Sequence, residues 1–284
     1  MEFAYIKKRL ANYFVSMKKL VIVKSGCREF GNELLNHMSV YACGLELGAR
    51  VINHSGFGYT GLWRLAHTLY ARMVSVLYSS SVLLAWRAPI YLPPTKNLAE
   101  KLSSQKILHL YGWLFRNPAG LEKYRKELLL AFTPAFIQQE LADSIHPQKG
   151  KTLIGVHIRQ KNFTGFESGE FLVSPIRTLR IVEEHIQHNS IDPKNVAMLI
   201  VSDLPIAPDI FARYPVYVVQ GNTEKNLFLL SRASVIVGTN TTFSNMAAWF
   251  GNVPHVVVDN EPLDWEYYKN KVGYFENKYA TFAY

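Results

Sequence analysis

The sequence predicts an α/β protein with parallel sheets, and two observations carry this prediction. From Lys151 onward, short apolar runs typical of strands alternate with segments typical of helices. This alternation indicates βαβ units, which build a parallel sheet with right-handed crossovers. The chain also has 284 residues, 49% of them hydrophobic, which is enough for two folded domains. We therefore expect two Rossmann-like domains facing a central cleft.

The second half of the sequence has the more regular pattern. Its apolar runs predict strands at 153–158, 196–201, 216–219, 235–237 and 255–258. The segments between them predict helices at 175–189, 206–212, 223–233 and 242–251. We place this Rossmann-like domain at 149–260, after the polar segment "SIHPQKGKT".

The first half, at 1–148, predicts a second Rossmann-like domain. A strand and turn at 20–27 lead into a helix that ends at Gly48, and residues 50–55 follow as a second strand. Further helices are expected at 62–85 and 121–143, whereas "ILHLYGWLF" fits either a strand or a helix. The aromatic tail at 261–284 is expected to pack back on the first domain.

Charge and cysteine content limit the classes of partner. The formal charge of +9 favours anionic partners, but the basic residues are scattered and no nucleic-acid recognition motif occurs, so we expect no nucleic-acid partner. Two cysteines, with no CxxC pair, fit a reducing compartment and disfavour a zinc site. No apolar run is long enough to span a membrane, and the N-terminus does not resemble a secretory signal. We expect a cytoplasmic protein.

Residues 1–19 predict a short basic amphipathic helix with two interpretations. Phe3, Ile6, Leu10 and Phe14 share one face. This face either packs on the first domain or makes peripheral contact with an anionic membrane surface.

Polar side chains follow three predicted strands of the second domain at their carboxyl ends, where parallel sheets bind ligands. His157 and Arg159 point to the same side of their strand, and arginine offers a fork of donors suited to phosphate. The alternatives are a core histidine and an arginine paired with a carboxylate. After the next strand, Asp203 either accepts hydrogen bonds from a nucleoside or caps a helix.

The third of these predicted strands ends in the segment "VIVGTNTTFSNMAAWF", where small polar residues join the strand to an apolar helix. Backbone N–H groups and hydroxyls at a helix N-terminus can bind phosphate, although a simple polar cap has the same composition. The first domain adds a loop with Arg28, Gly31 and Asn32. Two Rossmann-like halves, one of them with a phosphate-binding segment, suggest an enzyme that uses a sugar nucleotide. No acidic D-x-D pair occurs, so we expect neither a metal nor another cofactor. In such an enzyme, arginine, hydroxyls and helix ends would hold the leaving diphosphate.

These segments together resemble the α-1,2-fucosyltransferases of glycosyltransferase family 11, within a superfamily that includes the α-1,6- and protein O-fucosyltransferases. "GVHIRQKNF" resembles the H-x-R-x-G-D-Y motif, and "VSDLP" resembles the F-S-D-D segment. "GTNTTFSNMAAWFG" resembles N-S-S-F-S-W-W-A-A-W-L, and "REFGNELLNHMSVYACGLELGA" resembles the opening G-x-L-G-N-Q-x-x-Q-Y-A segment. The four segments occur in the family's order and cover both halves.

The resemblance implies a GT-B fold and an inverting, metal-independent transfer of fucose from GDP-fucose to a glycan hydroxyl, with an α-1,2 linkage favoured. A lipid-linked glycan would fit the basic chain as acceptor. The resemblance implies that the second domain binds the nucleotide sugar and that the first domain is the acceptor side. It implies that Arg159 holds the β-phosphate and stabilises the departing GDP, with His157 and Asp203 near the guanosine. The diphosphate would be held by Thr241, Thr242, Phe243 and Ser244, and Arg28 and Asn32 would face the donor from the first domain.

The sequence departs from the family in the second part of the H-x-R-x-G-D-Y motif, and this leaves alternatives open. Lys161-Asn162-Phe163 replaces Gly-Asp-Tyr, so Asn162 stands where the family has a carboxylate that either takes part in the chemistry or only orients the loop. The loop residues Glu167 and Glu170 are substitutes for this carboxylate or merely exposed charges. The alternatives are a GT-B transferase that uses another nucleotide sugar, and a catalytically weak homologue that binds a nucleotide sugar.

Overall fold

The computed structural model divides the chain into two compact units, Met1–Pro134 and Ala135–Tyr284. It describes residues 20–24, 29–53, 90–91, 107–111, 115–133, 151–161, 172–207, 209–219, 222–269, 274 and 277–278. The predicted domain boundary between 148 and 149 and the predicted helices at 1–19 and 62–85 lie outside these residues.

The first unit contains a parallel sheet with the strand order β2-β1-β4-β3. Its strands are β1 (Leu20–Lys24), β2 (Arg50–Asn53), β3 (Ile90–Tyr91) and β4 (Ile107–Tyr111). The ambiguous segment from Ile107 therefore begins as a strand. Val21 and Val23 are buried on one face of β1, as the period of two requires.

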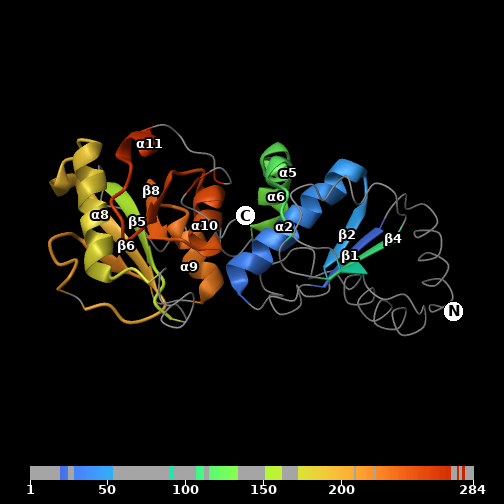
Figure 1. Cartoon of the computed structure of the whole chain (residues 1–284), viewed down its shortest axis with the longest axis horizontal. Coiled ribbons are helices and arrows are strands. Elements are labelled where there is room, and N and C mark those ends of the chain that lie inside the picture. The colour runs from blue at the N-terminus through green and yellow to red at the C-terminus, as the bar shows by residue number, and fades with distance from the viewer. Residues whose placement is uncertain are drawn as a thin grey trace. The chain divides into compact units, whose positions relative to one another are not determined.

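The helix α2 (Phe30–Leu47) follows β1 and packs on this sheet (Figure 1). Val40 and Cys43 of α2 share a core with the β1 valines and Phe115. The helix ends at the predicted residue because Gly48 takes the left-handed conformation, with φ of 59°.

Two short helices occupy the start of the region predicted as one helix at 121–143. They are α5 (Pro118–Lys123) and α6 (Arg125–Phe132), separated at Tyr124. The first begins earlier than predicted because Asn117 accepts the N–H of Gly120 and Pro118 occupies the first helical position. No Gly or Pro marks the break at Tyr124, where φ is −106° and ψ is 24°. The remainder of the predicted helix, from 134, is not described.

The second unit contains a five-stranded parallel sheet with the order β7-β6-β5-β8-β9. Its strands are β5 (Thr152–Ile158), β6 (Val196–Ser202), β7 (Val216–Val218), β8 (Val235–Thr239) and β9 (His255–Val258). All five predicted strands are confirmed. The strand order reverses at β5, so β5 and β8 flank the switch point at which such sheets bind ligands.

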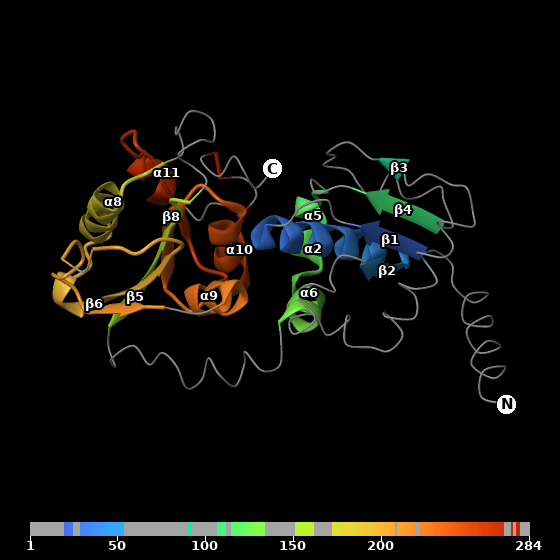
Figure 2. The ribbon, with the colours of Figure 1, turned by 90° about the horizontal axis from the view of Figure 1, so that it is seen from below.

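Helices cover both faces of this sheet (Figures 1 and 2). One face carries α8 (Pro175–His188) and α11 (Trp265–Lys269), and the other carries α9 (Thr223–Leu230) and α10 (Thr242–Gly251). A short 3-10 helix, Pro193–Asn195, precedes β6. Because both faces are covered, the strands are almost continuously apolar, as expected of a parallel sheet.

The helix predicted at 206–212 is wrong. Residues 209–213 form turns, and no helix occurs between β6 and β7 in the described part of that segment. Pro205 and Pro208 explain the error because proline lacks an N–H and disfavours helical backbone at the residue before it.

The described residues of the tail contact the second unit. The Tyr274 hydroxyl donates to Asn252, the Asn277 amide donates to the His255 carbonyl, and Lys278 pairs with Asp264. The rest of the tail after Lys269 lies outside the described residues. In the part of the chain that the structure describes, no helix is both long enough and apolar enough to cross a membrane.

Candidate functional site

The candidate site lies at the carboxyl ends of β5, β6 and β8, where the fold brings together segments far apart in the sequence. β5 ends one residue before Arg159, β6 ends one residue before Asp203, and β8 ends at Thr239. The parallel register pairs Ile158 with Ser202 and His157 with Gly238. The side chains that follow these strands therefore meet at one edge of the sheet.

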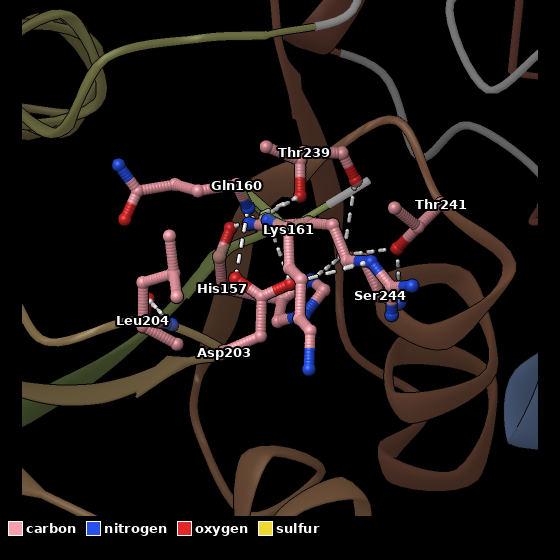
Figure 3. A network of polar contacts seen from close by, with 10 residues as sticks. His157, Gln160, Lys161, Asp203, Leu204, Thr239, Thr241 and Ser244 are labelled. Carbon is pink, nitrogen blue, oxygen red and sulfur yellow. Dashed lines mark hydrogen bonds and ion pairs between the residues drawn. The ribbon is translucent and has the colours of Figure 1, made fainter. Parts of the chain in front are cut away.

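Asp203 organises the loop that follows β5. Its carboxylate accepts the backbone N–H groups of Gln160 at 2.8 Å and Lys161 at 3.0 Å (Figure 3). It also forms an ion pair with Arg159, in which Nε lies 3.4 Å from Oδ2. Both charged side chains are about three-quarters buried, which weakens solvent screening of the pair. Asp203 thus fixes the backbone and the side chain at the end of the strand.

Thr239 ties the same loop to β8. Its hydroxyl accepts the backbone N–H of Arg159 at 3.2 Å and lies 3.5 Å from the carbonyl oxygen of His157. Arg159 is consequently held through its main chain by Thr239 and through its side chain by Asp203. Such fixation suits a guanidinium that must hold an anion without reorganising.

His157 is buried behind this edge and is held by α10. Its Nδ1 lies 2.6 Å from the Ser244 hydroxyl (Figure 3). Its ring packs on Phe243 with a centroid separation of 4.8 Å. Ser244 also donates to the carbonyl of Thr239 at 3.0 Å and lies 3.2 Å from the Thr241 hydroxyl.

Burial lowers the pKa of His157 to about 3, with smaller contributions from Arg159 and His255. The imidazole is therefore neutral at physiological pH and a poor base. Its chemistry at this site is hydrogen bonding and not proton abstraction.

A glycine makes the approach of α10 to β5 feasible. A Cβ atom at Gly238 would lie 2.7 Å from the Ser244 hydroxyl and 3.3 Å from the Cβ of His157. The absence of that atom lets Ser244 reach the histidine.

The N-terminus of α10 offers backbone donors beside Arg159's strand. Thr241 caps the helix by accepting the N–H of Ser244 at 3.2 Å. The N–H groups of Thr242 and Phe243 have no acceptor among the described residues. Free N–H groups and the helix dipole make this end a binding place for an anion.

A pocket of about 290 Å³ opens at the carboxyl ends of β6 and β7. Asp203 and Ser202 supply its polar edge, and its other walls are mainly apolar: Ile200, Leu204, Pro205, Ile206, Ala207, Phe211, Val216, Val218 and Val219. Apolar walls with a few polar groups are typical of sites for small organic ligands. Asp203 is shared between this pocket and the network that holds Arg159.

In the first unit, the predicted residue Asn32 lies in the first turn of α2 and not in a loop. The Asn32 side-chain oxygen lies 3.5 Å from Nη2 of the buried Arg116, whose Nη1 donates to the carbonyl of Phe115 at 2.9 Å. Asn36, one turn later, accepts the N–H of Phe115 at 2.9 Å. Arg116 was not predicted, and its only signal in the sequence is a charged residue directly after the apolar pair Leu114-Phe115.

The structure brings together six of the predicted second-domain residues: His157, Arg159, Asp203, Thr241, Phe243 and Ser244. Thr242 is buried in the first turn of α10. The predicted residues Arg28 and Asn162, and the loop glutamates Glu167 and Glu170, lie outside the described residues. Gly238 and Thr239 lie in the segment predicted to bind phosphate but were not singled out as donor-binding residues, and the apolar walls of the pocket were not predicted. No cluster of three potential metal ligands occurs in the part of the chain that is described.

No protein-family model matches the sequence, and no curated protein matches it either. Solved structures match the fold. A mutant of FUT1 from Arabidopsis thaliana in complex with GDP has a TM-score of 0.54 at 12% identity, covering 87% of this chain and 73% of that chain. POFUT1 in complex with GDP-fucose has a TM-score of 0.53 at 12% identity, covering 85% and 98%. POFUT1 in complex with GDP has a TM-score of 0.51 at 12% identity, covering 86% and 99%.

These structural neighbours are fucosyltransferases of the GT-B type. At this level of identity the likeness concerns the fold, and the specific resemblance to glycosyltransferase family 11 stays a prediction. The chain has an α/β fold with parallel sheets, similar to that of GT-B-type fucosyltransferases.

Proposed function

We propose that this protein is a glycosyltransferase that transfers fucose from GDP-fucose to a hydroxyl of a glycan acceptor. The observation that carries the proposal is the fixation of Arg159 beside the switch point of the second sheet. Asp203 holds its side chain and Thr239 holds its backbone, close in the fold to the free N–H groups of α10. A guanidinium and a helix N-terminus at one edge are suited to a diphosphate.

The chemistry follows from this charge arrangement. The acceptor hydroxyl attacks the anomeric carbon of fucose and releases its proton to solvent, while the bond from that carbon to the diphosphate oxygen breaks and GDP leaves. Negative charge grows on the departing GDP, where Arg159 and the N–H groups of Thr242 and Phe243 would stabilise it. The proposal includes a metal-independent, inverting reaction with an α-1,2 linkage, which the resemblance of the sequence to glycosyltransferase family 11 implies. It also includes a glycan or lipid-linked glycan acceptor and a cytoplasmic location.

We assign the nucleoside of the donor to the pocket beside Asp203. The mainly apolar pocket at the ends of β6 and β7 suits a flat base, and Asp203 and Ser202 provide hydrogen-bonding groups at its edge. In sheets of this kind, an acidic residue after the second strand commonly meets a nucleoside. The GDP and GDP-fucose complexes of the structural neighbours support guanosine as this nucleoside.

A donor panel tests the proposal. The purified protein is incubated with GDP-fucose, GDP-mannose, UDP-glucose and UDP-galactose, and the release of nucleoside diphosphate is measured with and without oligosaccharide acceptors. We expect release from GDP-fucose in preference to the other donors. Equal release from the UDP-sugars would contradict the guanosine assignment, and binding of GDP-fucose without any turnover would favour a non-catalytic binding protein.

A further inference from the structure

The Ser244 hydroxyl was expected to hold a phosphate, but the structure gives it a different set of partners. Ser244 is completely buried, and its oxygen contacts His157 Nδ1, the Thr239 carbonyl and the Thr241 hydroxyl. These three partners, all within the protein, take up the hydrogen-bonding capacity of the Ser244 hydroxyl. A hydroxyl in this position acts on a ligand only through another residue.

Donation by Ser244 to a carbonyl selects the tautomer of His157. The Ser244 hydroxyl donates its single proton to the Thr239 carbonyl at 3.0 Å, and a carbonyl can only accept. With this donation, Nδ1 of His157 is the donor in its 2.6 Å contact with the Ser244 oxygen. The ring is neutral, so Nδ1 carries its only proton and Nε2 carries a lone pair.

The Nε2 atom is open to a ligand. It lies across the ring from Nδ1 and has no hydrogen-bond partner among the described residues. The fully buried polar atoms that lack a partner do not include Nε2 of His157. This atom is therefore not fully enclosed by protein. The ring cannot easily turn, because Phe243 packs on it and Gly238 allows α10 to close over it.

We propose that Ser244 is a positioning residue that holds His157 as the Nδ1–H tautomer, so that Nε2 accepts a hydrogen bond from the bound nucleotide. This inference rests on the proposed function for the identity of the ligand. It assigns Ser244 to the orientation of His157 in place of direct phosphate binding.

Two measurements test the proposal. Long-range nitrogen–proton NMR spectra of histidine-labelled, ligand-free protein report which ring nitrogen of His157 carries the proton, and a His157→Asn variant assigns the signals. GDP affinity is measured by calorimetry for the wild type, Ser244→Ala and Ser231→Ala. Ser231 is the matched control because its hydroxyl also donates to a carbonyl, that of Phe228, but contacts no histidine.

We expect the Nδ1–H tautomer in the wild type, and a mixture of tautomers with about fivefold weaker GDP binding in Ser244→Ala. Ser231→Ala should keep both the tautomer and the affinity. An Nε2–H tautomer in the wild type would overturn the proposal even if Ser244→Ala fails to fold. Unchanged affinity and tautomer in a folded Ser244→Ala would also overturn it. An Nδ1–H tautomer without GDP binding would support the role of Ser244 on the ring and contradict the proposed function instead.

Discussion

At the scale of single residues, Asp203 illustrates how one carboxylate organises a binding loop. It satisfies two successive backbone N–H groups and the Nε of Arg159 at once. The two N–H groups of the loop after β5 thereby have a hydrogen-bond acceptor within the protein. The same carboxylate borders the pocket at the carboxyl ends of β6 and β7.

Replacing Asp203 by alanine should therefore separate loop order from overall stability. The variant loses hydrogen bonds at a partly exposed position, so we expect about 1–2 kcal/mol lower stability. We expect GDP affinity to fall about tenfold because Arg159 is no longer held. Urea denaturation and calorimetry measure the two effects, with Asp192→Ala as the control, since Asp192 accepts a single N–H from Lys194 away from the site. Equal GDP affinity in both variants would contradict the role given to Asp203.

At the scale of elements, the N-terminus of α10 is both a structural cap and a binding surface. The cap residue Thr241 satisfies the N–H of Ser244 and supports its hydroxyl. The helix α9 has a comparable cap, in which Asn222 accepts the N–H of Lys225 at 2.8 Å. The two helices allow a comparison of the same type of N-terminal cap inside and outside the proposed site.

Thr241→Ala and Asn222→Ala should each lower stability by about 1 kcal/mol, the usual cost of losing a helix cap. Only Thr241→Ala should also weaken GDP binding, because the end of α10 would hold the diphosphate. Thermal unfolding and calorimetry distinguish the two effects. If both variants bind GDP as the wild type does, the diphosphate does not lie at α10.

The same elements indicate which features a sequence can predict. The strands of the second sheet and the end of α2 at Gly48 depend on neighbouring residues, and they were predicted correctly. The hydrogen bond between His157 and Ser244 joins residues 87 positions apart, and the contact between Asn32 and Arg116 joins residues 84 apart. These pairings depend on strand register and helix packing, which no local pattern encodes. The helix predicted at 206–212 failed because apolar spacing was given more weight than two prolines.

At the scale of the whole molecule, buried histidines couple stability to pH. Burial lowers the pKa values of His37, His157 and His255 to about 3, well below that of an exposed histidine. Between pH 6.5 and 3 the unfolded chain binds protons that the folded protein excludes. The stability that these neutral side chains contribute is therefore present above pH 6.5 and is lost as pH falls towards 3.

Each of these histidines should add a slope of about 1.4 kcal/mol per pH unit in this range. Urea denaturation at pH 7, 6, 5 and 4 measures the slope. In the unfolding of the second unit, His157→Asn should lower the slope by the contribution of one histidine, about 1.4 kcal/mol per pH unit. Stability that stays constant or rises from pH 6 to pH 4 would contradict these pKa values.

The most direct measurement of the central claim is GDP-fucose turnover by the wild type, Arg159→Ala and Arg213→Ala. Arg213 is the control because it belongs to the same unit and forms an exposed ion pair with Glu183 away from the site. If Arg159 holds the departing diphosphate, its loss should reduce turnover by at least about a hundredfold, as expected for removal of a major charge-stabilising group, while Arg213→Ala keeps wild-type activity. Near-normal turnover in a folded Arg159→Ala would contradict the account.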